Sequence, residues 1–181
     1  MSFKTAFNSP LTIHPSQLNM DVLWSPWRYD YVNADNKKQA INDCVFCSIL
    51  ASPATDEEKF ILRRDGFNFV ILNKYPYTSG HLMIVPFAHL AELDELPKEA
   101  SDEMMDLTKH CQTVLREVYQ PDGINLGMNL GRAAGAGIAG HLHMHILPRW
   151  VGDANFMTTV GQTRTIPESL ITTYQKLKGK I

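Results

Sequence analysis

The 181-residue chain is poor in cysteine and has almost no excess of charge. Its three cysteines, Cys44, Cys47 and Cys111, are too few for a disulfide framework in a chain of this size, which favours a reducing, cytoplasmic setting. The formal net charge is −2 and no run of Lys or Arg occurs, so we expect no nucleic-acid polymer as a partner. The sequence also lacks an apolar block of signal-peptide or membrane-span length, so we expect no membrane partner.

The composition fits one domain with short additions, because 44% of the residues are hydrophobic and can bury a full core. Residues 1–40 are polar and interrupted by prolines, apart from an aromatic cluster at 23–29. We interpret them as an N-terminal extension that packs on the domain or on a partner subunit. The domain itself is expected over 41–160, followed by a C-terminal helical tail over 161–181.

The middle of the chain alternates between strand and helix patterns. The apolar runs 69–72 and 82–85 predict a β-hairpin with a wide loop. Apolar residues at spacings of three and four predict an amphipathic helix that starts near Ser101 and ends near Tyr119.

Two further strands and a final helix complete the expected fold. Residues 124–130 alternate between apolar and polar or glycine, which predicts a strand, and 141–147 alternate in the same way. A last helix is expected from about 167 to 178. Since no strand–helix–strand alternation occurs, the predicted fold class is α+β. We expect a mostly antiparallel sheet of about five strands, with a long helix and a C-terminal helix.

The stretch GHLHMHILPRW (140–150) places histidines at every second position. On a β-strand His141, His143 and His145 would share one face. As ordinary core residues they would be hard to satisfy, because each neutral ring carries both a donor and an acceptor. A metal site built from all three histidines is disfavoured. His141 and His145 are about 13 Å apart along a strand, whereas each ligand nitrogen must lie within about 2.1 Å of a zinc ion.

Nucleophilic catalysis is the third interpretation of this row. Neutral imidazole is a nucleophile near pH 7, and a neighbouring histidine can support the ring or protonate a leaving group. The glycine-rich segment 131–140 leads directly into the row, and its backbone N–H groups can hold an anion without a basic side chain. A glycine-rich loop is as often a plain turn, but its position here favours a phosphate substrate.

Residues 141–147, HLHMHIL, resemble the His-φ-His-φ-His-φ-φ signature of the histidine triad (HIT) nucleotide hydrolases and transferases. The resemblance extends from about Cys44 to Trp150. The segments that resemble the strands on the ribose side of that family are 69–76 and 79–86. The segments that resemble its branch of diadenosine tetraphosphate phosphorylases are 24–29, 129–131, 148–150 and 152–156.

This resemblance implies catalytic roles for the triad. His143 would attack the α-phosphorus and form a nucleotidyl-histidine intermediate. His145 would contact the phosphate and the leaving-group oxygen, and His141 would support the strand and the nucleophile. Water or orthophosphate would then resolve the intermediate, and the sequence leaves the choice between them open.

The resemblance also implies a nucleotide site. Asn73 would bind ribose, His81 would lie behind the triad, and Asn129 would face the phosphates. Gly137 departs from the family pattern, since related proteins often carry a hydroxyl or amide side chain there; only its backbone N–H is left to meet the phosphate. Trp150 would lie near the nucleotide, through the neighbouring subunit of a homodimer, which the family commonly forms.

Cys44 and Cys47 form a C-x-x-C pair with two open interpretations. They are either ordinary core cysteines or half of a metal site. Some relatives bind a structural zinc with such a pair, and the resemblance then implies Cys44, Cys47, His89 and His141 as the ligands. A divalent cation can in addition accompany a polyphosphate substrate.

The resemblance therefore predicts an enzyme that cleaves dinucleoside polyphosphates of the diadenosine tetraphosphate type by phosphorolysis or hydrolysis. Two alternatives stay open at this point. One is a nucleoside phosphoramidase or mononucleotidyl hydrolase of the same family. The other is a zinc-stabilised nucleotide-binding module without turnover.

Overall fold

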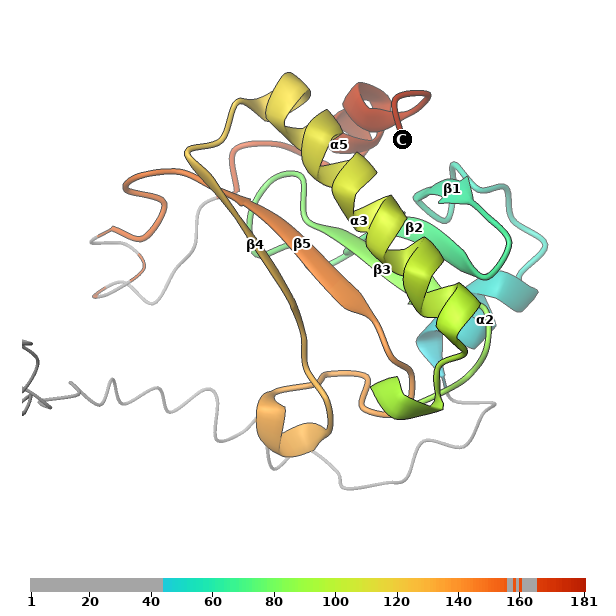
Figure 1. The fold of residues 1–181 in the computed structure, drawn as a ribbon. Helices are drawn as coiled ribbons and strands as arrows, with labels where there is room; N and C mark the ends of the chain where they lie inside the picture. Colours follow the sequence, from blue (N-terminus) through green and yellow to red (C-terminus); the bar gives the residue numbers. More distant parts are fainter. Residues whose placement is uncertain (1–43, 156–157, 159, 161–165) are drawn as a thin grey trace, which may run out of the picture. The chain divides into compact units, whose positions relative to one another are not determined.

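The computed structural model describes residues 44–155, 158, 160 and 166–181. The expected N-terminal extension and its aromatic cluster lie outside the described residues. The elements, in chain order, are α2 (Val45–Ala51), β1 (Ile61–Arg64), β2 (Asn68–Leu72), β3 (Leu82–Pro86), η3 (Leu93–Glu95), α3 (Lys98–Tyr119), β4 (Gly123–Met128), η4 (Arg132–Ala134), β5 (Met144–Arg149) and α5 (Leu170–Leu177) (Figure 1).

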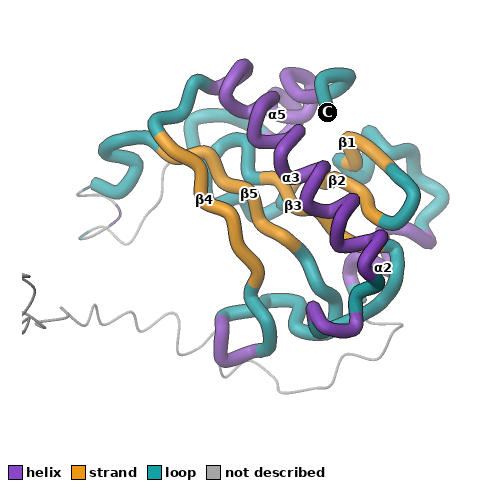
Figure 2. Tube along the Cα trace, in the orientation of Figure 1, coloured by secondary structure: helices purple, strands orange, loops and turns teal. Residues whose placement is uncertain are grey.

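The strands form one five-stranded sheet in the order β1-β2-β3-β5-β4 (Figure 2). Every neighbouring pair in it is antiparallel. The predicted α+β class is therefore confirmed. The sequence pattern did not locate β1 or α2: β1 has four residues and a register shift between Ile61 and Arg63, which leaves too little alternation to detect.

Both faces of the central strands are covered, because every residue of β2 and β3 is buried. The sheet side chains on the face that α3 covers, among them Val70 and Ile84, form one core cluster with Met104 and Leu115 of α3. The opposite face carries a second cluster built around Phe46 of α2. Two-sided burial explains why these strands are continuous apolar runs in the sequence rather than alternating ones.

Helix α3 begins earlier than its sequence pattern suggests. Its first residue is Lys98, with Pro97 at the N-cap, while Ser101 lies inside the first turn and its hydroxyl donates to the Lys98 carbonyl at 2.8 Å. The predicted end at Tyr119 is confirmed. Gln120 there adopts the left-handed conformation, with φ 46°, that commonly closes a helix.

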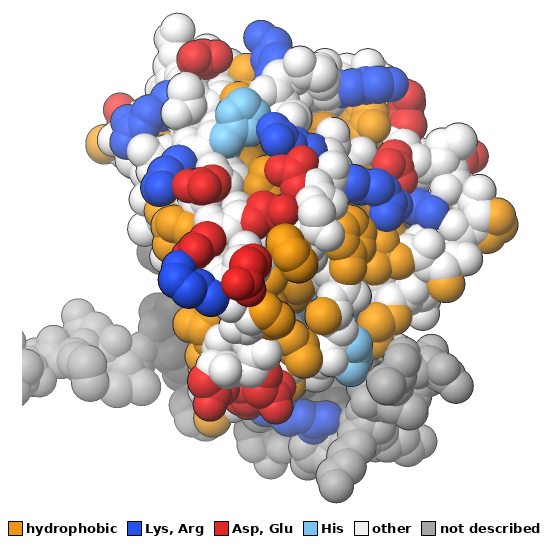
Figure 3. Space-filling model, turned by 45° about the vertical axis from the view of Figure 1, so that its right-hand side comes forward, with side chains coloured by type: hydrophobic (Ala, Val, Ile, Leu, Met, Phe, Trp, Pro, Cys, Tyr) orange, Lys and Arg blue, Asp and Glu red, His pale blue; other side chains and the backbone are white. Residues whose placement is uncertain are grey.

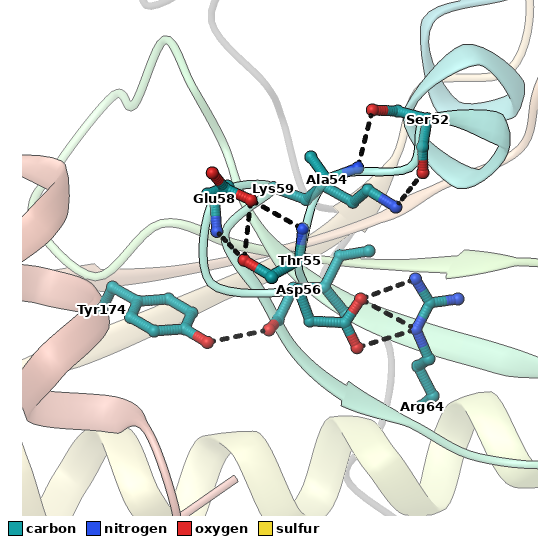
Figure 4. A network of polar contacts seen from close by, with 9 residues as sticks. Ser52, Ala54, Thr55, Asp56, Glu58, Lys59, Arg64 and Tyr174 are labelled. Carbon is teal, nitrogen blue, oxygen red and sulfur yellow. Dashed lines mark hydrogen bonds and ion pairs between the residues drawn. The ribbon is translucent and has the colours of Figure 1, made fainter.

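Long-range polar contacts fix the helices and loops around the sheet. Glu103 of α3 accepts hydrogen bonds from the backbone N–H groups of Gly66, Phe67 and Asn68, at 3.0, 2.9 and 2.9 Å, and so ties α3 to the β1–β2 turn. The loop between α2 and β1 is held by a network of hydrogen bonds and ion pairs (Figure 4). The Tyr174 hydroxyl of α5 donates to the Ile61 carbonyl at 3.3 Å and so joins α5 to β1.

Charged side chains of both signs lie on the surface of the described residues. Acidic and basic side chains are interspersed on the face that Figure 3 shows, so the described residues there present no basic stripe. Among the described residues, no helix combines the length and apolarity needed to cross a membrane.

Candidate active site

The histidine row only partly belongs to a strand. Strand β5 begins at Met144, so His145 is the one triad member within the ladder, where it pairs with Met83 of β3. Before Met144 the chain is held instead by the Leu142 N–H, which donates to the Leu90 carbonyl at 2.6 Å. Because His141 lies outside the ladder, its ring is not forced to lie beside that of His143.

A fourth histidine, His81, joins the row from the start of β3. His81, His141, His143 and His145 are only 1%, 0%, 5% and 8% exposed. Gly80, directly before His81, has φ +78°, and a Cβ there would lie 3.1–3.3 Å from the side chains of Pro148, Tyr119 and Leu115. Glycine is therefore needed for the turn that delivers His81 to the site.

Burial keeps this row uncharged. Desolvation lowers the pKa of His81 to about 3, with further contributions from His145 and His143. Desolvation, followed by the nearby His143, lowers the pKa of His145 to about 4. The pKa of His143 is also lowered by burial, against a hydrogen bond to the His141 carbonyl that raises it. All three imidazoles are therefore neutral at pH 7, the form in which a ring nitrogen can act as a nucleophile.

The hydrogen bonds fix which nitrogen of His81 and of His145 carries the proton. The Tyr77 backbone N–H donates to His81 Nδ1 at 3.2 Å, so that nitrogen is an acceptor and the proton lies on Nε2. His81 Nε2 lies 2.9 Å from His145 Nδ1 and donates to it. His145 therefore carries its own proton on Nε2, which is left as a donor.

The tautomer of His143 is the opposite. Its Nδ1 lies 2.8 Å from the His141 carbonyl oxygen, which can only accept, so the proton of His143 lies on Nδ1. Its Nε2 thus carries a free lone pair. The ring centroids of His143 and His145 are 4.8 Å apart, which places a nucleophilic nitrogen beside an N–H donor. This pair can perform nucleophilic attack and hydrogen-bond a leaving oxygen at one centre.

Phe46 of α2 supports the row from the side. It is 1% exposed, and its ring centroid lies 5.3 Å from those of both His141 and His143. Sequence reasoning missed Phe46, although it stands between the two cysteines of the C-x-x-C pair. Its position there is a usable signal, since a ring within a two-cysteine turn must lie close to whatever those cysteines contact.

We expect Phe46→Leu to lower kcat about tenfold more than it raises KM, because the smaller side chain leaves the His143 ring without its packing surface. Steady-state kinetics on the best substrate, together with the histidine NMR signals, would measure this. Phe69→Leu is the matched control, since Phe69 is 0% exposed in the same cluster but makes no ring contact to a histidine among the described residues. Equal kinetic losses in both variants would contradict a specific role for Phe46.

Four metal-ligating side chains converge at the start of the row. One ligand atom each from Cys44, Cys47, His89 and His141 lies within 4.8 Å of the other three. His141 Nδ1 lies 3.3 Å from Cys44 Sγ and 3.7 Å from Cys47 Sγ, and His89 Nδ1 lies 3.3 Å from Cys47 Sγ. Tetrahedral zinc with ordinary bond lengths would separate its sulfur and nitrogen ligands by about 3.6 Å. The donor set therefore fits a closed four-coordinate metal ion.

The protonation state of His141 also suits a metal. Its Nε2 lies 2.9 Å from the Pro86 carbonyl oxygen and so carries the proton, which leaves the lone pair of Nδ1 directed at the two cysteines. A backbone carbonyl that accepts from the other ring nitrogen is the usual arrangement around a metal-bound histidine. A strand that began at His141 would hold this ring beside that of His143, and the start of β5 at Met144 removes that constraint.

The neutral row makes stability depend on pH. His81 and His145, with native pKa values of about 3 and about 4, bind fewer protons in the folded chain than in the unfolded chain, where histidine has a pKa near 6.5. The unfolding free energy should therefore be unaffected by these groups above about pH 6.5 and should fall as the pH drops towards 4.

Urea unfolding at pH 7.5 and pH 5 would measure this loss. His81→Gln should flatten the dependence, because glutamine cannot take up the proton. An unchanged slope in His81→Gln would contradict the assignment.

The residues expected to bind the nucleotide differ in how near they lie to the histidine row. Asn73 lies at the row, with Nδ2 3.4 Å from His81 Nδ1. Asn129 directly follows β4. The last residue of β4, Met128, pairs with Met144 of β5, which directly follows His143. Gly137 lies exposed in the loop between β4 and β5. Trp150 packs edge-on against Tyr119, 6.3 Å away, and among the described residues no ring contact joins it to the histidines.

Comparison with known proteins agrees with this geometry. Residues 54–151 match the HIT domain. The chain belongs to the HIT family. The resemblance noted in the sequence is thus confirmed, and the row described above is the triad of a HIT domain.

The HIT relatives cover most of the chain. An AP-4-A phosphorylase of Mycobacterium tuberculosis is 40% identical over 157 residues, which span 82% of this chain and 77% of the relative. An adenylylsulfatase of Arabidopsis thaliana is 33% identical over 108 residues, 60% of this chain and 53% of the relative. Among solved structures, a Zn-bound histidine triad family protein from Mycobacterium smegmatis aligns with a TM-score of 0.62 at 27% identity, over 78% of this chain and 94% of that one.

Proposed function

We propose that this HIT protein is a nucleotidyl-transfer enzyme that cleaves dinucleoside polyphosphates of the diadenosine tetraphosphate type, with orthophosphate as the acceptor. The observation that carries the proposal is the pair of opposite tautomers, a lone pair on His143 Nε2 beside an N–H on His145 Nε2. The 40% identical relative named AP-4-A phosphorylase supports the substrate and the acceptor.

In the first step His143 Nε2 attacks the α-phosphorus, and the bond from that phosphorus to the bridging oxygen breaks. His145 donates a hydrogen bond from its Nε2–H to the departing oxygen and keeps that proton, so that ATP leaves as its anion and an adenylyl group remains on His143. The His143 ring carries its own Nδ1 proton throughout, held by the His141 carbonyl. A preorganised donor on the oxygen where negative charge develops is worth roughly 10²–10³ in rate.

In the second step an oxygen of orthophosphate attacks the same phosphorus. The P–N bond breaks, ADP forms, and His143 recovers its lone pair, while the Nε2–H of His145 can hydrogen-bond the incoming acceptor. The products are ADP and ATP. Asn73 beside His81 would bind the ribose, and Asn129 and the backbone of Gly137 would meet the phosphates.

We propose zinc as the ion for Cys44, Cys47, His89 and His141. With four protein ligands it would be structural, and it would fix the segment that leads into the catalytic row. His141 would then serve the reaction through its backbone carbonyl, which orients His143, rather than through its ring. A divalent cation would arrive with the polyphosphate rather than reside in the protein.

A homodimer and a cytoplasmic setting complete the proposal. Strand β4 is the edge of the sheet, and Asn125, Leu126 and Gly127 on it are exposed, so its open backbone groups can pair with a second copy. Cys44, Cys47 and Cys111 form no disulfide, which favours a reducing compartment.

Product analysis of diadenosine tetraphosphate, with and without orthophosphate, tests the function. We expect ADP plus ATP, formed only when phosphate is present. AMP plus ATP without phosphate would make the enzyme a hydrolase instead. If neither tube yields product, the proposed substrate is wrong.

A second candidate within the family is cleavage of a mononucleotide adduct, such as a nucleoside phosphoramidate or an adenylylsulfate. The similarity to the adenylylsulfatase of Arabidopsis thaliana favours this candidate. The same two tautomers would serve, because the attacked phosphorus is again the α-phosphorus. Relative kcat/KM values on the two substrate classes decide between the candidates.

A further inference from the structure

The sheet face that carries His145 continues onto the edge strand β4, which lies beside β5 (Figure 1). His145 pairs with Met83 of β3 on one side and with Gly127 of β4 on the other. Paired residues point to the same face of a sheet, so Asn125, two residues from Gly127, lies on this face as well. Gly127 and Asn125 are both exposed, so this face of β4 is open directly beside the histidine row.

Gly127 leaves room next to His145. Apart from its chain neighbours, no described atom lies within 4 Å of the point where a Cβ of this residue would stand. Its φ is outside the left-handed region, and β4 pairs with β5 without a register shift, so neither a turn nor a bulge requires glycine here. Glycine weakens a strand interior, and where no bulge or bend accounts for it, it often marks the close approach of a ligand.

The two sides of His145 meet different parts of the substrate. On one side its Nδ1 lies 2.9 Å from Nε2 of His81, which directly precedes β3. Asn73, the residue proposed to bind the ribose of the transferred nucleotide, lies on that side too, 3.4 Å from His81 Nδ1. Because the two nitrogens of an imidazole point away from each other, the Nε2–H of His145 points away from His81. The departing oxygen that this N–H bonds is therefore on the other side, where β4 and Gly127 lie.

Asn125 supplies a donor on that side. Its Oδ1 accepts from Arg149 Nη1 at 2.7 Å, which fixes the orientation of the amide, and among the described residues it makes no other hydrogen bond. The Nδ2 group, which can only donate, is thus left for a ligand that carries acceptor oxygens. Same-face neighbours on a strand are about 7 Å apart, so Asn125 lies one such step from Gly127, a distance that three linked phosphates span. Pairing of the β4 edge with a second copy would use backbone groups and leave this face unchanged.

We propose that Gly127 and Asn125 form the subsite for the phosphate chain of the leaving group. Gly127 leaves room for that chain beside His145, and Asn125 donates to it from Nδ2. Both are therefore specificity residues for substrates whose leaving group is a polyphosphate rather than a small group such as ammonia or sulfate. This rests on the proposed function, because it takes the bond at the α-phosphorus as the one that breaks.

Calorimetric titration of the full chain with inorganic tripolyphosphate and, separately, with AMP tests the two sides of His145 independently. Gly127→Val, which fills the space, and Asn125→Ala, which removes the donor, should each weaken tripolyphosphate binding about tenfold. Both variants should bind AMP with wild-type affinity. Valine is favoured in strands and would meet no atom at its Cβ, so Gly127→Val is expected to fold.

Gly123→Val is the matched control. Gly123 lies on the same face of β4, where a Cβ would again have no described atom within 4 Å, but about 13 Å from Gly127. It should leave both affinities unchanged. In turnover of diadenosine tetraphosphate, Gly127→Val and Asn125→Ala should each lower kcat/KM about tenfold.

Unchanged tripolyphosphate binding in either variant would overturn the role of that residue. An equal loss of AMP binding would overturn the subsite, since the substitution would then disturb the whole row. Wild-type protein that binds AMP but no tripolyphosphate would overturn it as well. Wild-type protein that does not cleave diadenosine tetraphosphate, but whose variants separate the two affinities as expected, would contradict the proposed function and support the subsite.

Discussion

His143→Asn is expected to lower kcat by roughly 10⁴-fold or more while leaving nucleotide binding largely intact. The asparagine amide can still donate to the His141 carbonyl, as His143 Nδ1 does at 2.8 Å, so the local fold is retained. It has no nucleophilic nitrogen, however, and the adenylyl intermediate cannot form. Single-turnover kinetics and titration with a non-hydrolysable diadenosine tetraphosphate analogue would measure the two quantities separately.

The matched control is His110→Asn on α3, a histidine outside the row, which should keep wild-type turnover. Residual activity in His143→Asn at the wild-type level would remove His143 from the mechanism. A variant that loses binding together with turnover would point instead to a mainly structural role for this ring.

Cys44→Ser is expected to release the metal ion and to lower stability by several kcal/mol, because a structural zinc site contributes its binding free energy to folding. The wild-type protein should contain about one zinc per chain, and the variant close to none. Metal analysis by mass spectrometry and thermal unfolding with and without a chelator would measure both effects. Cys44 is 1% exposed and its Sγ lies 3.3 Å from His141 Nδ1, so the loss should also loosen the segment leading into the row.

Cys111→Ala is the control for this experiment. Cys111 is also fully buried, at 0% exposed, but it lies in the α3 core and outside the four-ligand set. It should keep the zinc whatever happens to its stability. Wild-type protein purified without any metal, and equally stable with a chelator present, would contradict the metal assignment.

Residue types at fixed spacing made the centre of the site predictable from sequence. Three histidines at period two, next to a glycine-rich segment, indicated both the row and its phosphate chemistry. The four candidate metal ligands were also predicted, and the structure brings their ligand atoms within 4.8 Å of one another. The two strands that read as continuous apolar runs, β2 and β3, were found because burial on both faces leaves that pattern.

The parts that escaped prediction depend on tertiary contacts. Strand β1 is four residues long and interrupted by a register shift, so its own sequence carries little signal. The start of β5 at Met144 rather than at His141 is set by the contact of Leu142 with Leu90, far away in the chain. Phe46 and Tyr77 are ordinary aromatic residues in sequence, and only the packing of α2 and the β2–β3 loop places them at the two ends of the row.

The opposite tautomers of His143 and His145 give the two rings different chemical properties. A backbone N–H at Tyr77 and a backbone carbonyl at His141 are fixed groups that cannot exchange donor and acceptor roles. Through His81, the Tyr77 N–H fixes the proton of His145 on Nε2. The His141 carbonyl holds the proton of His143 on Nδ1 and so leaves Nε2 of that ring without one. In the proposed mechanism, two neutral histidines with lowered pKa values thereby become a hydrogen-bond donor and a nucleophile at the same pH.

The most direct measurement of this account is to trap the intermediate. The enzyme is mixed with diadenosine tetraphosphate without orthophosphate, quenched within milliseconds under alkaline conditions, digested and analysed by mass spectrometry. We predict one adenylyl group per chain, on the peptide that contains His143 and on that residue, and its disappearance as ADP once phosphate is added. An adenylyl group on His145, or turnover with inversion at phosphorus and no adduct, would contradict the account.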